Sequence, residues 1–270
     1  MKTFLGNEIF PVTLQCTYKD SLEMPTFLDL LRLLSDYGFY GIELNLPDLQ
    51  SLPPQILHSL LNTYGLKLTY IATGAYAKKH EFSLSSSDSE IRRKSIEGCK
   101  ENIRYAGECN SGIIIGFLKN NPITDKNNAL LYLEDSLSQL ELFARKHNVP
   151  ILLEATNRYE SSVANTLEET VRITDHIGGQ MLSVLPDTYH MNIEESNPLE
   201  ALDHYQGRYQ NIHLSDNNRL FPGLGHISFE SYLQKLKSIH YQGLLGIEGN
   251  VKHDIMQDLK ISVNYLYKNI

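Results

Sequence analysis

Cysteine is scarce in this sequence of 270 residues, which contains three. Cys16, Cys99 and Cys109 do not form an even disulfide framework, and their spacing is not that of a metal-binding cluster. Free cysteines persist in reducing compartments, so we expect a cytoplasmic protein. Long hydrophobic runs are also lacking, since none approaches the roughly 18 apolar residues that span a bilayer.

A signal peptide and a polyanion-binding surface are not expected either. The first 16 residues, "MKTFLGNEIFPVTLQC", carry one early lysine, and Gly6, Asn7, Glu8 and Pro11 interrupt their apolar stretch. Lys and Arg number 24 against 32 Asp and Glu, a formal net charge of -8. Because nucleic-acid affinity depends largely on basic contacts to phosphate, we expect no nucleic-acid partner, although a small anionic substrate stays possible.

Short apolar runs alternate with longer helical patterns along the whole chain. Several runs are apolar without strict alternation, as in parallel strands covered on both faces. The candidate strands are 10–15, 41–46, 67–73, 112–117, 149–155, 181–187, 211–215 and 244–249, and the clearest amphipathic helices are 25–38, 88–108, 127–148 and 228–240.

Eight strand–helix units of roughly 34 residues each suit an α/β fold of the closed (β/α)₈, or TIM barrel, type. A doubly wound open sheet is the competing architecture, but it normally uses fewer strands. No Pro/Gly/Ser-rich linker divides the chain, so we expect a single barrel domain over residues 1–270.

The last four candidate strands end in charged or imidazole side chains: Glu154, Asp187, His213 and Glu248. In a barrel, the carboxyl ends of the strands converge on one mouth. A lone Glu or His there is more often an exposed or hydrogen-bonding residue, but four at successive strand ends favour a metal site. Three carboxylates and one imidazole suit a divalent cation; Mn²⁺ is the first choice, and Mg²⁺, Co²⁺ or Zn²⁺ are possible.

Further polar side chains follow these strand ends closely. Arg219 stands in a Gly/Pro-containing loop six residues after His213, which favours a functional role. For Arg158 we favour a surface salt bridge, a common and weak interaction. The neighbouring polar residues considered are Asn157, Arg158, Glu160, His190, Asp216 and Arg219.

Four motifs follow the last four candidate strands: "EATNRYE" (154–160), "DTYHMNIEE" (187–195), "HLSDNNR" with "PGLGH" (213–226) and "GIEGN" (246–250). They resemble the xylose-isomerase-like family of sugar isomerases and epimerases, and within it most closely the ketose 3-epimerases that act on D-tagatose and D-psicose. The resemblance is specific mainly between 150 and 250. The first half of the chain matches in the rhythm of strands and helices only.

The resemblance implies roles for individual residues. Glu154, Asp187, His213 and Glu248 would be the metal ligands, with Glu154 and Glu248 also forming the acid/base pair. Glu160, His190 and Arg219 would contact the O1–O2 end of the substrate. Asp216 departs from the family pattern: ketose 3-epimerases carry Glu there, and relatives acting on keto-glycosides can carry Asp. The resemblance also implies a homodimer or homotetramer.

The expected activity is metal-dependent epimerisation at C3 of a ketose or a 3-keto sugar through an enediolate. One carboxylate removes the proton beside the carbonyl and a second returns it from the other face.

Aldose–ketose isomerisation and dehydration of an inositol-type ketone are alternatives on the same site. An abasic-site endonuclease is disfavoured because it needs more histidines at strand ends, and a non-catalytic sugar-binding barrel is disfavoured by the acid/base pair. The segments around Cys16, Glu43, Gly74 and Phe117 are expected to line the pocket.

Overall fold

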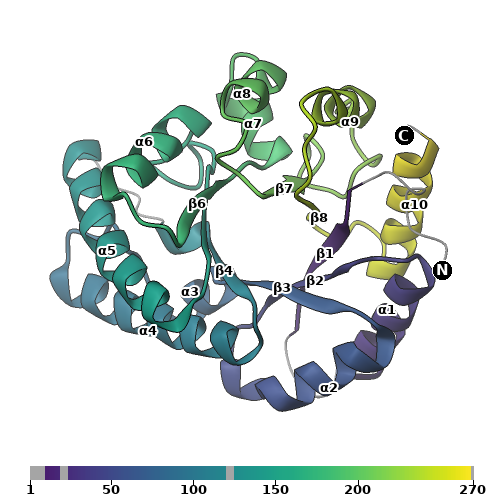
Figure 1. Ribbon diagram of the computed structural model, residues 1–270, viewed down its shortest axis with the longest axis horizontal. Helices are drawn as coiled ribbons and strands as arrows, with labels where there is room; N and C mark the ends of the chain where they lie inside the picture. The colour runs from purple at the N-terminus through teal and green to yellow at the C-terminus, as the bar shows by residue number, and fades with distance from the viewer. Residues whose placement is uncertain (1–9, 19–23, 120–124, 269–270) are drawn as a thin grey trace.

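The computed structural model describes residues 10–18, 24–119 and 125–268. Eight parallel strands form one sheet in the order β6-β5-β4-β3-β2-β1-β8-β7, curved into a barrel with helices around it (Figure 1). The strands are β1 (Val12–Thr17), β2 (Gly41–Asn45), β3 (Lys67–Ala72), β4 (Gly112–Ile115), β5 (Ile151–Glu154), β6 (Leu182–Leu185), β7 (Asn211–Leu214) and β8 (Leu244–Ile247). Each overlaps a predicted strand, and the predicted (β/α)₈ barrel is confirmed.

Helices follow the strands and have recognisable ends. Asp88 and Asp125 cap the two longest helices by accepting backbone N–H bonds, while Gly65 and Gly178 end two others in the left-handed conformation that glycine favours. The α-helices are α1 (Met24–Asp36), α2 (Pro54–Tyr64), α3 (Gly74–His80), α4 (Ser89–Glu108), α5 (Lys126–His147), α6 (Leu167–Ile177), α7 (Thr188–Glu194), α8 (Pro198–His204), α9 (Phe229–Ser238) and α10 (Ile255–Lys268), with short 3₁₀ turns η2 (Leu49–Ser51) and η3 (Phe117–Lys119). Within these ranges no helix has the length and apolar character to cross a membrane.

The barrel closes between β6 and β7, and this seam is looser than the other strand pairs. In the described residues, the two strands are joined by the isolated bridges Val184↔Tyr209 and Asp187↔His213. The hydroxyl of Thr188 adds a link, because it donates to the carbonyl oxygen of Ser215 and accepts from the Ser215 N–H. The seam therefore ends in side-chain contacts at the mouth.

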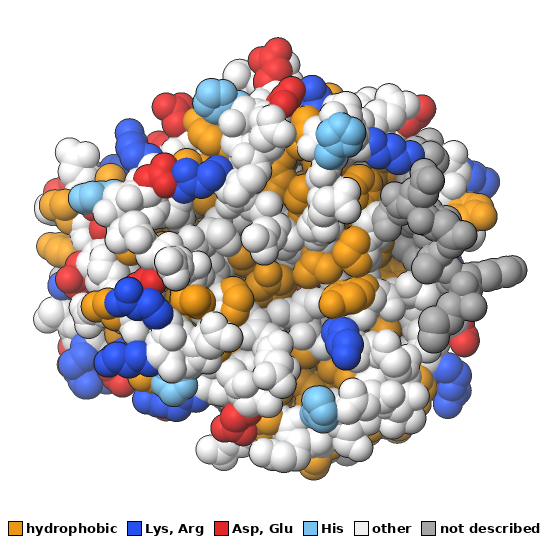
Figure 2. Space-filling model, in the orientation of Figure 1, with side chains coloured by type: hydrophobic (Ala, Val, Ile, Leu, Met, Phe, Trp, Pro, Cys, Tyr) orange, Lys and Arg blue, Asp and Glu red, His pale blue; other side chains and the backbone are white. Residues whose placement is uncertain are grey.

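The strands separate an apolar outer layer from a partly polar interior. Ile42, Leu44 and Ile212 belong to the large core between sheet and helices, whereas Glu43 and His213, one position along the same strands, are fully buried on the other face. A second, smaller apolar cluster of Ile114, Leu152 and Leu185 lies apart from the main core. In Figure 2, hydrophobic side chains gather near the centre of the visible face and charged ones lie mostly toward its edge.

Candidate metal centre and substrate site

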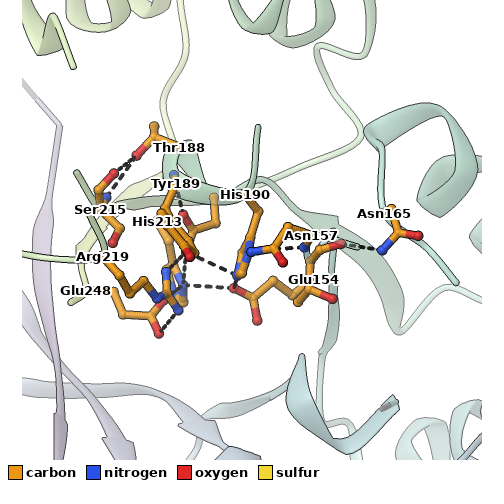
Figure 3. A network of polar contacts seen from close by, with 12 residues as sticks. Glu154, Asn157, Asn165, Thr188, Tyr189, His190, His213, Ser215, Arg219 and Glu248 are labelled. Carbon is orange, nitrogen blue, oxygen red and sulfur yellow. Dashed lines mark hydrogen bonds and ion pairs between the residues drawn. The ribbon is translucent and has the colours of Figure 1, made fainter. Parts of the chain in front are cut away.

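The four predicted metal ligands meet at one point. Glu154 is the last residue of β5, Asp187 follows β6 as the N-cap of α7, His213 is in β7 and Glu248 directly follows β8. One ligand atom from each residue lies within 4.8 Å of the other three. Figure 3 shows Glu154, His213 and Glu248 converging from different strands. The parallel strands thus bring together residues almost a hundred positions apart.

Three of these side chains present polar atoms that fit a cation. In the described part of the chain, Glu154 Oε1, His213 Nδ1 and Glu248 Oε2 are buried without a hydrogen-bond partner. His213 Nδ1 lies 2.5 Å from Glu248 Oε2 and 3.7 Å from Glu154 Oε1. Glu248 is ion-paired with His213 and Arg219, whereas a buried carboxylate oxygen without a partner, such as Glu154 Oε1, is costly. A divalent cation that bound these atoms would offset that cost. The donor set therefore fits the expected metal.

Glu43 supports His213 from behind. Its Oε2 lies 2.7 Å from His213 Nε2, and its Oε1 accepts hydrogen bonds from Asn211 Nδ2 at 2.7 Å and Thr13 Oγ1 at 3.0 Å. A carboxylate on one ring nitrogen orients the other nitrogen toward a metal. The segment around Glu43 was expected to line the pocket; Glu43 itself is fully buried and contacts His213. The alternation in "GIELN", which turns Glu43 inward, was the available signal.

Two glycines leave room for these side chains. A Cβ at residue 116, just after β4, would lie 1.9 Å from Glu154 Oε2. At Gly246, in β8, it would lie 2.8 Å from Glu43 Oε1 and 2.9 Å from the His213 ring. Any larger residue at either position would displace the carboxylate or the imidazole. Sequence reasoning did not identify these glycines, because their contacts come from neighbouring strands.

His190, predicted to bind substrate, lies beside the candidate ligands in α7. Its Nε2 is 3.7 Å from Glu154 Oε1 and 4.0 Å from Asp187 Oδ2, and Figure 3 shows the ring between Glu154 and Asn157. Burial lowers the pKa of His190 to about 3, so the ring is neutral around pH 7.

Arg219 brings a positive charge directly onto two of the candidate ligands. Its Nη1 pairs with Asp187 Oδ2 and its Nη2 lies 2.6 Å from Glu248 Oε1, while the guanidinium lies 5.1 Å from the ring centroid of Tyr189. Arg219 thus pairs with two of the three neighbouring carboxylates, Asp187 and Glu248. The third, Glu154, has an Oε1 without a hydrogen-bond partner in the described residues, where a divalent cation would add positive charge.

Asp216 organises the loop that carries Arg219. It is fully buried, and its two oxygens accept four backbone N–H bonds, from Asn217, Gly223, Gly225 and Ile227. Arg219 itself adopts a left-handed backbone with φ 61°, and its N–H bonds back to the Asp216 carbonyl oxygen. The Asp at this position therefore has a structural task in the loop, which the sequence did not reveal.

The two other polar residues of the motif after β5 differ in role. Arg158 forms a two-pronged ion pair with Glu194, both N···O distances being 2.8 Å, and its side chain is 59% exposed; the expected surface salt bridge is present. Glu160 is half-buried. Burial raises the pKa of Glu160, and the nearby positive charge of Arg219 partly offsets this rise. Glu160 is therefore close enough to Arg219 for the two charges to interact.

The proposed acid/base pair is electrostatically unequal. Burial raises the pKa of Glu154 to about 7, with His213 opposing the shift. Burial also acts to raise the pKa of Glu248, but Arg219 and His213 outweigh it and hold the pKa at about 2. Carboxyl pairs whose environments separate their pKa values in this way are suited to acid/base work. A bound cation would lower both values.

Fold and site together describe a (β/α)₈ barrel with a carboxylate-rich candidate metal centre at its mouth. The family model described as a xylose isomerase-like TIM barrel matches residues 31–268, and the chain belongs to this family.

Named relatives agree with the family. The chain is 29% identical over 227 residues to a D-psicose 3-epimerase from Enterocloster bolteae, covering 80% of this chain and 74% of that protein. It is 25% identical over 256 residues to a probable ketose 3-epimerase from Synechocystis, covering 92% and 80%. A 3-dehydro-D-guloside 4-epimerase from Escherichia coli is 34% identical over 118 residues, 44% of this chain and 45% of that protein. The resemblance to ketose 3-epimerases is confirmed.

Solved structures show the same fold. An L-ribulose 3-epimerase superposes with a TM-score of 0.83 at 20% identity, covering 97% of this chain and 94% of that one. The apo 3-keto-D-glucoside 4-epimerase from E. coli gives a TM-score of 0.80 at 22% identity, covering 97% and 99%.

Proposed function

We propose that this protein is a divalent-metal-dependent carbohydrate epimerase that inverts a carbon next to the carbonyl group of a ketose or a 3-keto sugar. The observation that carries the proposal is the meeting of Glu154 and Glu248, from β5 and β8, with Asp187 and His213 around one point. The names of the relatives support the same class, since they are epimerases of ketoses and of a keto-glycoside.

Glu154, Asp187, His213 and Glu248 would hold the metal. Mn²⁺ is the preferred ion because three of the four donors are carboxylates. When bound, the cation stabilises the negative charge that develops on the substrate oxygens as the proton leaves.

The proton transfers belong to the two glutamates. A C–H beside a carbonyl is a weak acid, so the base must be held within reach of the proton. Glu154 and Glu248 approach the same point from strands separated by β6 and β7, so one can take the proton from one face of the planar enediolate and the other can return it to the opposite face. Their roles exchange when the reaction runs in reverse.

Three further side chains would hold the O1–O2 end of the sugar. The guanidinium of Arg219, next to Asp187 and Glu248, would stabilise oxygen charge during proton transfer. His190 and Glu160 would donate and accept hydrogen bonds to the same end. The protein would act as a homodimer or homotetramer in the cytoplasm, where its cysteines, all free, stay reduced.

The test is solvent exchange at carbon. The protein loaded with Mn²⁺ is incubated in D₂O with a panel of free ketoses and 3-keto glycosides, with or without EDTA, and the products are read by NMR. We expect EDTA-sensitive deuterium at the epimerised carbon, and its loss in Glu248→Gln. Full activity in that variant would refute the acid/base assignment. An aldose product would indicate an isomerase, and a product lighter by one water would indicate a dehydratase.

A further inference from the structure

Asn157, three residues after Glu154 at the end of β5, contacts His190 through both its backbone and its side chain. Its backbone N–H donates to His190 Nδ1 at 3.1 Å, and its amide Nδ2 lies 2.8 Å from the same ring nitrogen. The N–H of Tyr159 donates to Asn157 Oδ1 at 2.9 Å. Since a backbone N–H can only donate, this bond fixes the amide with its NH₂ group toward His190 (Figure 3).

These donors determine where His190 carries its proton. Nδ1 faces two N–H groups and must accept, so in the neutral ring the proton is on Nε2. Nε2 is buried and has no hydrogen-bond partner in residues 10–18, 24–119 and 125–268. It points toward the site, 3.7 Å from Glu154 Oε1. An N–H donor is therefore held ready at the place where substrate would bind.

His213 presents its other ring nitrogen to the site. Its Nε2 lies on the carboxylate of Glu43, an acceptor, at 2.7 Å, so in the neutral ring the proton is on Nε2 and the lone pair is on Nδ1, which faces the candidate metal position. The two buried histidines thus share the Nε2–H tautomer but turn different nitrogens toward the site: His190 presents its Nε2–H, and His213 presents its Nδ1 lone pair. His213 can ligate a cation and His190 cannot.

We infer that Asn157 is a positioning residue that keeps His190 in the Nε2–H tautomer. His190 then donates a hydrogen bond to a carbonyl or hydroxyl oxygen of the sugar and stays outside the metal's ligand set. The nature of that acceptor rests on the proposed function, but the tautomer does not.

Asn157→Asp tests the inference with almost no change in shape. The carboxylate still accepts from Tyr159 N–H but has no N–H to give, so of the two donors that face Nδ1 only the backbone N–H of residue 157 remains. An acceptor takes the place of the nearer donor, so Nδ1 should gain a proton and Nε2 should lose its preference for one. The matched control is Asn165→Ala in the same loop. Asn165 donates to the carbonyl oxygens of Thr156 and Ser161 at 2.7 and 2.9 Å and has no contact with His190 in the described residues, so this variant loosens the loop alone.

The direct readout is ¹⁵N NMR of histidine-labelled protein, with the His190 signals assigned from a His190→Gln variant. We expect an Nε2-protonated ring in the native protein and in Asn165→Ala, and loss of that signature in Asn157→Asp. Turnover should fall about 10–100-fold in Asn157→Asp, with kcat affected more than KM. An Nδ1-protonated native ring, or an unchanged tautomer in Asn157→Asp, would overturn the inference. The expected spectra without turnover of any sugar would uphold the positioning role and reject the proposed function.

Discussion

Single side chains behind the candidate ligands decide how well the site is organised, and Glu43 is the clearest case. Glu43→Ala leaves the Nε2–H of His213 without its acceptor, so the ring can turn and its Nδ1 no longer points at the cation. We expect Mn²⁺ affinity, measured by titration calorimetry, to fall about 10–100-fold. Thr13→Val, which removes one hydrogen bond to Glu43, should lower Mn²⁺ affinity much less. Equal affinities in native protein and Glu43→Ala would contradict this role.

Gly116 tests the space around Glu154. Because a Cβ there would lie 1.9 Å from Glu154 Oε2, Gly116→Ala must move the carboxylate. A displacement of about 1 Å can cost roughly 100-fold in rate, so we expect a loss of this order with the circular dichroism spectrum retained. Gly74→Ala is the control, since its Cβ would have no neighbour closer than 3.6 Å. Similar activity losses in both variants would disprove a specific effect on Glu154.

The convergence of four polar side chains could be predicted from sequence because each stands at a strand end. Glu154, Asp187, His213 and Glu248 each follow an apolar run and could be aligned without knowing the strand register. The role of Gly116 could not be predicted in this way, because it depends on which side chain of β5 faces it across the sheet. Local patterns contain no information about such cross-strand contacts.

At the scale of elements, the conformation of the loop between β7 and α9 depends on the hydrogen bonds that Asp216 accepts. Asn can accept at one oxygen only, so Asp216→Asn would leave N–H groups of the loop unpaired, each at a cost of about 1–3 kcal/mol. We expect a lower free energy of unfolding in urea and a higher KM, because Arg219 is carried by this loop. Asn217→Ala, which loses one acceptor contact to His226 N–H, should have a smaller effect. An unchanged KM in Asp216→Asn would show that this loop does not contribute to substrate binding.

Elements differed in how far the sequence could predict them. The long helices α4 and α5 were predicted nearly to the residue, because their apolar periodicity continues over several turns. α7 was not predicted, since seven residues are too few for a periodicity. Its N-cap is Asp187, whose Oδ1 accepts from Tyr189 N–H at 2.7 Å, so one carboxylate both begins a helix and faces the metal position.

For the whole molecule, the candidate metal centre coincides with the weakest seam of the barrel. Asp187 and His213, on its two sides, form one of the isolated bridges between β6 and β7. A cation held by both residues would join the strands where the backbone ladder is incomplete. Metal binding and barrel stability should therefore be linked, by about 2.7 kcal/mol when free metal is at 100 times its dissociation constant.

The linkage should depend on pH. Without metal, Glu154 titrates at about 7 instead of its ordinary 4.5, so the native state keeps a proton that the unfolded chain has released. Its contribution to stability therefore falls as pH rises through this window, by up to about 3 kcal/mol.

Neighbouring carboxylates, Glu43 first among them, overcome the effect of burial and raise the pKa of His213, whose stabilising protonation is also lost as pH rises. Glu248, whose pKa is lowered from 4.5 to about 2, loses its contribution as the pH falls between these two values.

Metal binding should oppose this loss, because the ligands bind the cation in their deprotonated forms and affinity rises with pH. We expect the difference in unfolding free energy between Mn²⁺-loaded and EDTA-treated protein, from urea titrations followed by circular dichroism, to be larger at pH 7.5 than at pH 5.5. Glu154→Gln removes the titrating carboxyl, so its metal-free stability should change less over the same range. A metal-free native protein that became more stable from pH 5.5 to 7.5 would show that Glu154 is ionised throughout, and that the charge of the mouth is already balanced by Arg219 and His213.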